Sequence, residues 1–224
     1  MKTIREEYLN RLTDEFKIMS DAVIEQLEII HKQIKGESSE ELFVKIKANE
    51  QLINQCEVKI REEIVNSIVL QSPRASDLRR LIAYFDMIGN LERTGDLLYG
   101  ISKRMSDLLK KDSIYELFKE DALKLFEMSN KMIQNAIFAF IQEDNDIANN
   151  VIRSDDFVDD LDIKIHKKLL SITDKEKYPD FFADSLNIER ISYKLERIGD
   201  SATNIAEAVI FLTEGRDIKH IHKI

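Results

Sequence analysis

Two pairs of acidic residues have the type and spacing that could support metal chemistry. Glu92 and Asp96 form one pair, and Glu196 and Asp200 form the other. Residues at positions i and i+4 of an α-helix lie on one face, with Cβ atoms about 5–6 Å apart. Two carboxylates held so close repel each other unless a proton or a cation compensates their charge. Each pair is therefore a candidate set of metal ligands.

The two pairs belong to a motif that occurs twice. Leu-Glu-Arg-Thr-Gly-Asp at 91–96 recurs as Leu-Glu-Arg-Ile-Gly-Asp at 195–200, displaced by 104 residues. The arginine that follows each glutamate, Arg93 or Arg197, is expected to point about 100° away from that glutamate around the helix. We therefore do not expect either arginine to neutralise the acids of its own motif.

Each copy of the motif also carries a glycine, Gly95 or Gly199, inside a predicted helix. Glycine costs about 1 kcal/mol relative to alanine at an exposed position in a helix interior. Its presence in both copies indicates either close approach of a neighbouring helix or a required local geometry. Tight packing without any metal would explain it equally well.

Further oxygen-bearing side chains occur in the helical segment that precedes each motif. Asp155 and Asp159 are spaced four apart, and Glu50 and Asn54 occupy the matching places, with Glu57 one turn beyond. If the two segments of each half pack together, these side chains converge with the acids of the motif. Such a set favours Fe, Mn, Zn, Mg or Ca. The candidate metal ligands are Glu50, Asn54, Glu57, Glu92, Asp96, Asp155, Asp159, Glu196 and Asp200.

The elements that must position these residues are long helices. The sequence has 224 residues, with only 6 Gly and 2 Pro, too few for the many turns of an all-β protein. Apolar residues recur at steps of three and four, which is typical of amphipathic helices. The pattern predicts six helices. The first covers about 4–34 and the second ends near 71, and the others cover about 76–111, 114–142, 144–170 and 181–213. Ser76 is the predicted N-cap of the third helix.

The repeated motif divides these six helices into two related halves. Each half has three helices, and the motif lies on the third. We therefore predict an all-α fold of six long helices in two tandem, related three-helix bundles, one over residues 1–111 and one over 112–224.

Composition excludes several classes of function. A net charge of −9 argues against nucleic-acid binding, which needs a concentrated basic surface. No Gly-x-x-x-x-Gly-Lys-Ser/Thr loop is present, and the single cysteine, Cys56, rules out a disulfide framework and a cysteine-based zinc site. The N-terminal segment has no apolar core typical of a secretory signal, and no stretch approaches the roughly 20 apolar residues that span a bilayer. We expect a cytoplasmic protein that reaches a membrane only through partners.

The chain resembles the PhoU family over nearly its whole length. The resemblance is carried by five segments, namely 76–79 (Ser-Asp-Leu-Arg), 91–96, 195–200, 202–207 (Ala-Thr-Asn-Ile-Ala-Glu) and 214–220. It implies two three-helix bundles whose Glu/Asp-x-x-x-Asp motifs bind multinuclear metal clusters. That role would fall on Glu92, Asp96, Glu196 and Asp200, and then on Glu50, Asp155 and Asp159. Asn54, which replaces a second acid, is expected to weaken the site of the first half.

The same resemblance implies a regulatory protein rather than an enzyme. It would damp phosphate uptake when phosphate is plentiful, acting on the ATPase of the phosphate ABC transporter and on its sensor histidine kinase. We also expect a homodimer, because an exposed apolar helix face in a bundle of this kind favours association with a second copy.

Two other classes remain compatible with the residues. A carboxylate-bridged metalloenzyme, such as an oxidase or a phosphoesterase, would need an open coordination position and a general base. Glu28 and His31 match the Glu-x-x-His element of di-iron bundles, but such a site needs two copies and only one is present. A purely structural helical protein, whose acid pairs are only solvated faces, is the third reading.

Overall fold

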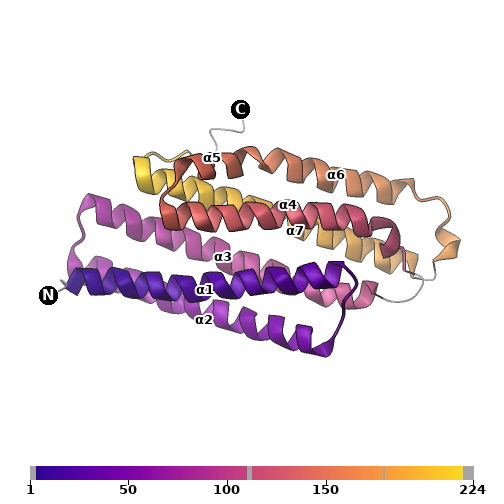
Figure 1. Ribbon diagram of the computed structural model, residues 1–224, viewed down its shortest axis with the longest axis horizontal. Coiled ribbons are helices and arrows are strands. Elements are labelled where there is room, and N and C mark those ends of the chain that lie inside the picture. Colours follow the sequence, from indigo (N-terminus) through magenta and orange to yellow (C-terminus); the bar gives the residue numbers. More distant parts are fainter. Residues whose placement is uncertain (1–3, 110–112, 179, 219–224) are drawn as a thin grey trace.

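The computed structural model describes residues 4–109, 113–178 and 180–218, and these residues form an all-α protein (Figure 1). This confirms the predicted fold class. The helices are α1 (Ile4–Ile34), α2 (Glu40–Gln71), α3 (Ala75–Leu108), α4 (Tyr115–Gln142), α5 (Asn145–Arg153), α6 (Asp155–Ser171), a short 3₁₀ turn η1 (Lys175–Lys177) and α7 (Phe181–Glu214).

Helix ends occur where the residue types allow the chain to leave or enter a helix. Gly36, with φ of +104°, adopts a left-handed conformation just after α1. The Ser39 hydroxyl accepts a hydrogen bond from the backbone N–H of Leu42 and so caps α2. Gly215, with φ of +69°, ends α7 in the same way as Gly36 follows α1. These breaks separate the helices where the sequence pattern indicates.

Two predicted details of the helices are wrong. The third helix begins at Ala75, because the extended backbone ends at Arg74, and Ser76 therefore lies inside the first turn and not at the cap. The fifth predicted helix is divided into α5 and α6 at Ser154. The Ser154 hydroxyl donates a hydrogen bond of 2.8 Å to the carbonyl of Asn150, a local bond that competes with the helical backbone pattern.

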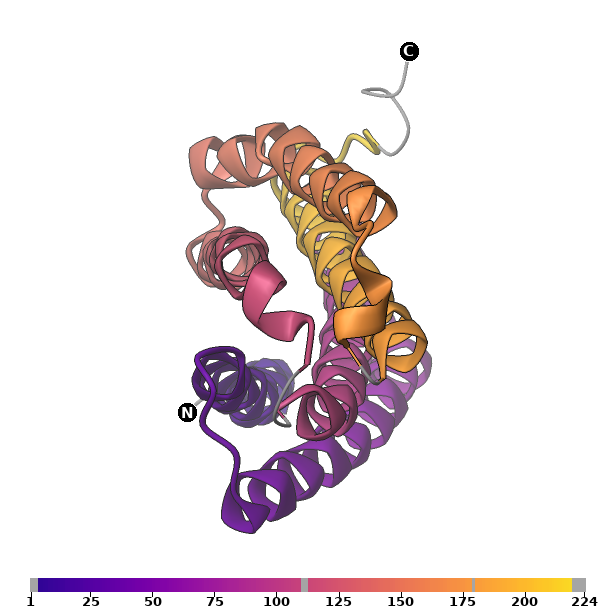
Figure 2. The ribbon, with the colours of Figure 1, turned by 90° about the vertical axis from the view of Figure 1, so that its right-hand side faces the viewer.

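The helices form two groups that share one hydrophobic core. Helices α1, α2 and α3 pack together, as do α4, α5, α6 and α7, and the groups meet mainly along α3 and α7 (Figure 2). Tyr115 of α4 donates a hydrogen bond of 2.9 Å to the carbonyl of Ile34, and Asn204 of α7 donates one of 3.2 Å to the side chain of Asn90 in α3. The predicted boundary between residues 111 and 112 lies outside the described residues. Within them, no helix combines the length and the apolar character needed to cross a membrane.

Candidate metal centre

The carboxylates of the first half gather between α2 and α3. The Glu92 side chain is half-buried, and its pKa is raised by burial first, then by the negative charges of Asp96, Glu57 and Glu50, against the opposing charge of Arg61. The helix pair therefore brings together the acids that the sequence predicts for this half. Their mutual repulsion is the condition that a cation would relieve.

Asn54 changes the electrostatics of this first group. Its side-chain nitrogen donates a hydrogen bond of 2.8 Å to Glu50, whereas its side-chain oxygen is buried without a hydrogen-bond partner. Arg61 forms an ion pair with Glu57 at 2.9 Å. The first group thus holds fewer uncompensated negative charges than it would with an acid in place of Asn54.

The second half repeats the arrangement between α6 and α7 with more acids. The pKa of Glu196 is raised to about 7, chiefly by burial and next by Asp200, with Asp159 and Asp162 adding to the shift and Arg197 opposing it. One carboxylate oxygen of Glu196 is buried and has no hydrogen-bond partner. A carboxylate in this setting binds either a proton or a cation more readily than one in water.

Arg197 does not behave as the motif predicts. Its guanidinium donates to a carboxylate oxygen of Asp200 at 2.6 Å, so the arginine does neutralise one acid of its own motif. Arg197 points away from its neighbour Glu196, but Asp200 is three residues further on, where side chains meet on a helix surface. Arg93, the equivalent residue of the first motif, is exposed and forms no ion pair with a described acid.

The two glycines of the motif lie where neighbouring helices approach closely. A Cβ atom on Gly95 would lie 2.9 Å from Cδ1 of Ile53, and one on Gly199 would lie 3.2 Å from Cγ1 of Val158. Ile53 belongs to α2 and Val158 to α6, and both are fully buried. Glycine therefore allows α3 and α7 to approach the helices that carry the other acids.

Asp162 and His166 are members of the second group that the sequence argument missed. Asp162 accepts a hydrogen bond of 2.6 Å from Ser192 and lies 3.1 Å from Nδ1 of His166. The signal was available, because displacement of Glu57 by 105 residues, the spacing between Glu50 and Asp155, leads to Asp162. The same displacement maps Arg61, the cation beside Glu57, onto His166.

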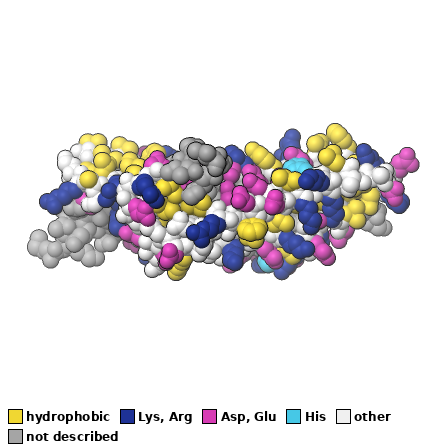
Figure 3. Space-filling model, turned by 90° about the horizontal axis from the view of Figure 1, so that it is seen from above, with side chains coloured by type: hydrophobic (Ala, Val, Ile, Leu, Met, Phe, Trp, Pro, Cys, Tyr) yellow, Lys and Arg dark blue, Asp and Glu magenta, His cyan; other side chains and the backbone are white. Residues whose placement is uncertain are grey.

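The residues present fit a cation held by oxygen ligands. Asn54 and Glu196 each have a buried side-chain oxygen without a hydrogen-bond partner. Oxygen atoms of this kind are the ligands that hard metal ions prefer. Acidic side chains also gather near the middle of the face where α5 and α6 lie (Figure 3). In the described part of the chain, however, no three His, Cys, Asp or Glu side chains already converge on one point. Binding of an ion would therefore require these side chains to rotate toward one another.

Glu28 and His31 do not extend either group. The His31 ring stacks on Phe126 of α4, with ring centroids 5.6 Å apart and planes inclined by 13°. Glu28 lies instead along an open groove between α1 and α2 that is also lined by Asp21 and Glu25. The di-iron pattern is therefore not assembled by these residues.

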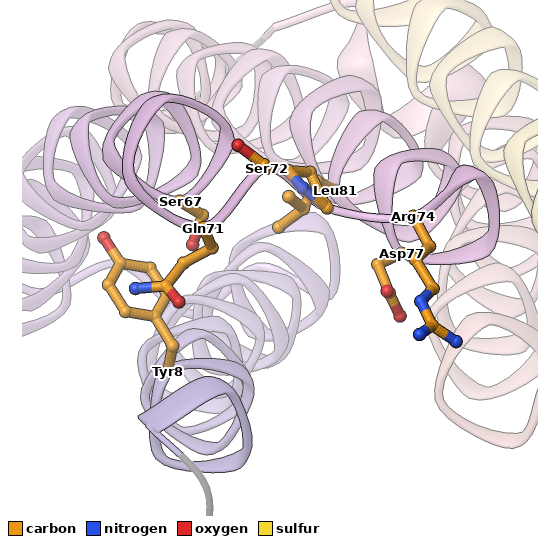
Figure 4. Close-up of a pocket in the computed structure, with 8 residues that line it drawn as sticks. Tyr8, Ser67, Gln71, Ser72, Arg74, Asp77 and Leu81 are labelled. Atoms are coloured by element: carbon orange, nitrogen blue, oxygen red, sulfur yellow. The ribbon is translucent and has the colours of Figure 1, made fainter.

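A cavity of about 180 Å³ lies apart from both acidic groups (Figure 4). Tyr8 and Gln71 lie on one side of it, and Arg74 and Asp77 lie on the other, where α1, α2 and α3 come together. Asp77 belongs to the first of the segments that carry the family resemblance. None of the predicted metal ligands lines this cavity.

A family model described as the PhoU domain matches residues 16–105 and 122–209, one segment in each half of the chain. The chain belongs to the PhoU family. The matched segments contain all nine predicted metal ligands.

Named relatives and solved structures agree with this assignment. A phosphate-specific transport system accessory protein PhoU homolog from Pseudomonas aeruginosa is 36% identical over 171 residues, covering 75% of this chain and 69% of that protein. The homolog from Aquifex aeolicus is 28% identical and covers 92% of this chain and 89% of its own length. The crystal structure of PhoU from P. aeruginosa matches with a TM-score of 0.83 at 29% identity, covering 94% of this chain and 99% of that one. The Streptococcus pneumoniae structure, at 22% identity and a TM-score of 0.78, supports the fold alone.

Proposed function

We propose that this protein is an accessory regulator of a phosphate transport system that restrains phosphate uptake when phosphate is plentiful. Family membership supports the association with phosphate transport, since relatives are named accessory proteins of that system. The observation that carries the proposal furthest is the pair of carboxylate groups on α2–α3 and α6–α7, which recur in both halves. We infer a regulatory and binding role rather than catalysis.

In this proposal each of the two carboxylate clusters holds metal ions. Fe, Mn, Zn, Mg and Ca are all compatible with oxygen ligands. Glu50, Asn54, Glu57, Glu92 and Asp96 would serve the first site, and Asp155, Asp159, Asp162, Glu196 and Asp200 the second. The ions would supply positive charge that lets the half-buried acids stay ionised together. Metal binding would then stabilise the α2–α3 and α6–α7 contacts, because the ligands come from both helices of each pair.

The proposed partners are the ATPase of the phosphate ABC transporter and its sensor histidine kinase, which the protein would meet at the cytoplasmic side of the membrane. A second copy of the chain, giving a homodimer, is part of the same proposal. An all-helical protein with exposed faces on several long helices has ample surface for such contacts.

Elemental analysis of protein purified without chelator tests the metal sites. We expect bound metal in the wild type and its loss when both Asp96→Asn and Asp200→Asn are introduced, because each change removes one ligand charge and keeps the side-chain shape. A matched control is the double variant Glu116→Gln, Glu120→Gln, which alters an exposed i, i+4 acid pair on α4. A wild type free of metal, or equal loss in the control, would contradict the proposal for these residues.

Phosphate uptake by cells tests the regulatory role separately. Deletion of the gene should raise phosphate uptake at high external phosphate, and the wild-type gene should restore the restraint. The Asp96→Asn, Asp200→Asn gene should fail to restore it although the protein accumulates normally. Unchanged uptake after deletion would contradict the regulatory role and leave the metal measurement unaffected.

A further inference from the structure

Four basic side chains cluster where the C-terminal half of α3 lies against the N-terminal half of α7. This basic cluster consists of Lys103 and Arg104 of α3 with Arg190 and Lys194 of α7. The chain as a whole carries a net charge of −9, so this cluster has the opposite sign to the molecule. None of the four forms an ion pair with an acidic side chain among the described residues.

The ammonium group of Lys194 is in an unfavourable place for a lone cation. It is partly withdrawn from water, and Arg104, Arg190 and Lys103 repel it, with Asp96 as the opposing negative charge nearby. Its position depends on Gly100 of α3, because a Cβ on that glycine would lie 2.7 Å from Nζ and 2.9 Å from Cε of Lys194. The lysine therefore lies directly across the α3 backbone.

Arg104 is oriented by a neighbour and retains an unused donor. Its Nη1 donates a hydrogen bond of 3.2 Å to Oδ1 of Asn187 in α7. Its Nε is buried and has no hydrogen-bond partner. Lys103 lies with Nζ 4.0 Å from the centre of the Tyr99 ring. Neither of these two cations is compensated by a carboxylate.

The two ends of the α3–α7 pair differ in charge. Displacement by 104 residues, the spacing of the repeated motif, relates Lys103 to Glu207, Arg190 to Asp86, and Lys194 to Asn90. These counterparts lie at the opposite end of the same helix pair, where Asp86 and Glu207 line a small pocket and Asn90 hydrogen-bonds to Asn204. The pair is thus built with acids and amides at one end and with cations at the other.

We propose that the basic cluster binds a tetrahedral oxyanion of the phosphate type, either inorganic phosphate or the phosphoryl groups of a nucleotide. Guanidinium and ammonium groups donate charge-assisted hydrogen bonds to such oxygens, and an anion with several oxygens accepts from several donors at once. Bound there, the anion offsets the repulsion among the four cations and provides an acceptor for Arg104. The proposal does not rest on the regulatory role or on the metal sites.

Calorimetric titration of the chelator-treated, full-length protein tests the site, with inorganic phosphate and ATP as separate ligands at constant ionic strength. Chelator treatment removes ions that could themselves bind phosphate. We expect saturable binding of at least one ligand, weakened tenfold or more by Lys194→Gln and by Arg104→Gln. Lys131→Gln, which removes one exposed charge from α4, should change the affinity less than twofold. Binding of ATP without phosphate would identify a nucleotide as the source of the phosphoryl group.

Gly100→Ala provides a variant that keeps every charge. The added methyl group would displace the flexible end of Lys194, and alanine is the better helix former, so thermal denaturation should show a fold at least as stable as the wild type. We expect at least fivefold weaker oxyanion binding, together with loss of the ligand-induced shift of the Arg104 Nε–H resonance in NMR spectra.

Three outcomes would overturn the proposal. They are the absence of saturable binding of both ligands, an equal small decrease in every variant including Lys131→Gln, and unchanged affinity in Gly100→Ala. Binding of a glutamate-rich peptide without binding of phosphate or ATP would likewise assign the cluster to a protein partner instead.

Discussion

At the scale of single residues, the carboxylate cluster on α2–α3 and the one on α6–α7 differ in charge, although they occupy equivalent positions in the two halves. The first contains Asn54, whose amide bonds to Glu50, and Arg61, which pairs with Glu57. At the corresponding places the second has Asp159 and His166. A site with more negative charge holds cations more tightly. We therefore expect the α6–α7 site to keep its metal at chelator concentrations that empty the α2–α3 site. Elemental analysis at increasing chelator concentration tests this with two variants. Asp96→Asn leaves the α6–α7 site intact, and Asp200→Asn leaves the α2–α3 site intact.

The raised pKa of Glu196 predicts a pH effect on the metal-free protein. The folded-state value of about 7 exceeds the ordinary 4.5, so the folded state holds the proton more tightly than the unfolded state does. The stability that results is fully present below about pH 4.5 and is lost as the pH rises through about 7. We expect the melting temperature to fall between pH 5 and pH 8 by a few degrees more in the wild type than in Glu196→Gln, at roughly 2–4 °C per kcal/mol.

The control for this effect is Glu116→Gln, since Glu116 is an exposed acid of α4. It should keep the pH dependence of the wild type, because other ionisable groups contribute equally to both proteins. An identical pH dependence in Glu196→Gln and in the wild type would show that Glu196 is not the group responsible.

At the scale of helices, the glycines of the motif determine how closely the acid-bearing helices approach. Gly95→Ala would place a methyl group 2.9 Å from Cδ1 of Ile53 in the core. Overpacking of this kind costs about 1–3 kcal/mol, and the gain in helix propensity offsets about 1 kcal/mol of it. We expect a net loss of up to about 2 kcal/mol in the free energy of unfolding, measured by urea denaturation.

Two comparisons separate this packing effect from a general effect of alanine. Gly89→Ala, also in α3, meets only the flexible end of Arg61 at 3.1 Å and should be neutral or stabilising. Ile53→Val removes the clashing Cδ1 atom, so Gly95→Ala should cost less in that background than in the wild type. Strictly additive effects would contradict the proposed contact.

At the scale of the whole molecule, the two halves share a core and should unfold together. Buried residues of both halves form one hydrophobic cluster, and Tyr115 of α4 hydrogen-bonds to the end of α1 through Ile34. Burial of the Tyr115 hydroxyl raises its pKa well above the usual range. We therefore expect that neither half melts alone.

We expect a single urea transition at which circular dichroism and tyrosine fluorescence coincide. Tyr115→Phe should lower the midpoint of that transition by the equivalent of about 1–2 kcal/mol, because the buried carbonyl of Ile34 loses its bonded partner. The transition should remain single. Two separated transitions would mean that the bundles are independent domains.

Much of the fold could be predicted because long amphipathic helices are local structures. The apolar steps of three and four, Gly36, Pro73 and Gly215 were enough to place the helices to within a few residues. The division at Ser154 could not be read in this way, because it depends on a side-chain bond to the carbonyl of Asn150 that competes weakly with the helix.

The sequence by itself determined the helices, the duplication and the acids that belong to each half, since these follow from periodicity and from spacing along one chain. Only the tertiary structure decided which charges meet across helices. It placed Asp162 of α6 close to Glu196 of α7, and it brought Arg190 and Lys194 of α7 beside Lys103 and Arg104 of α3. Electrostatic interactions depend on distance and on burial, and neither quantity is present in a sequence until the helices have packed.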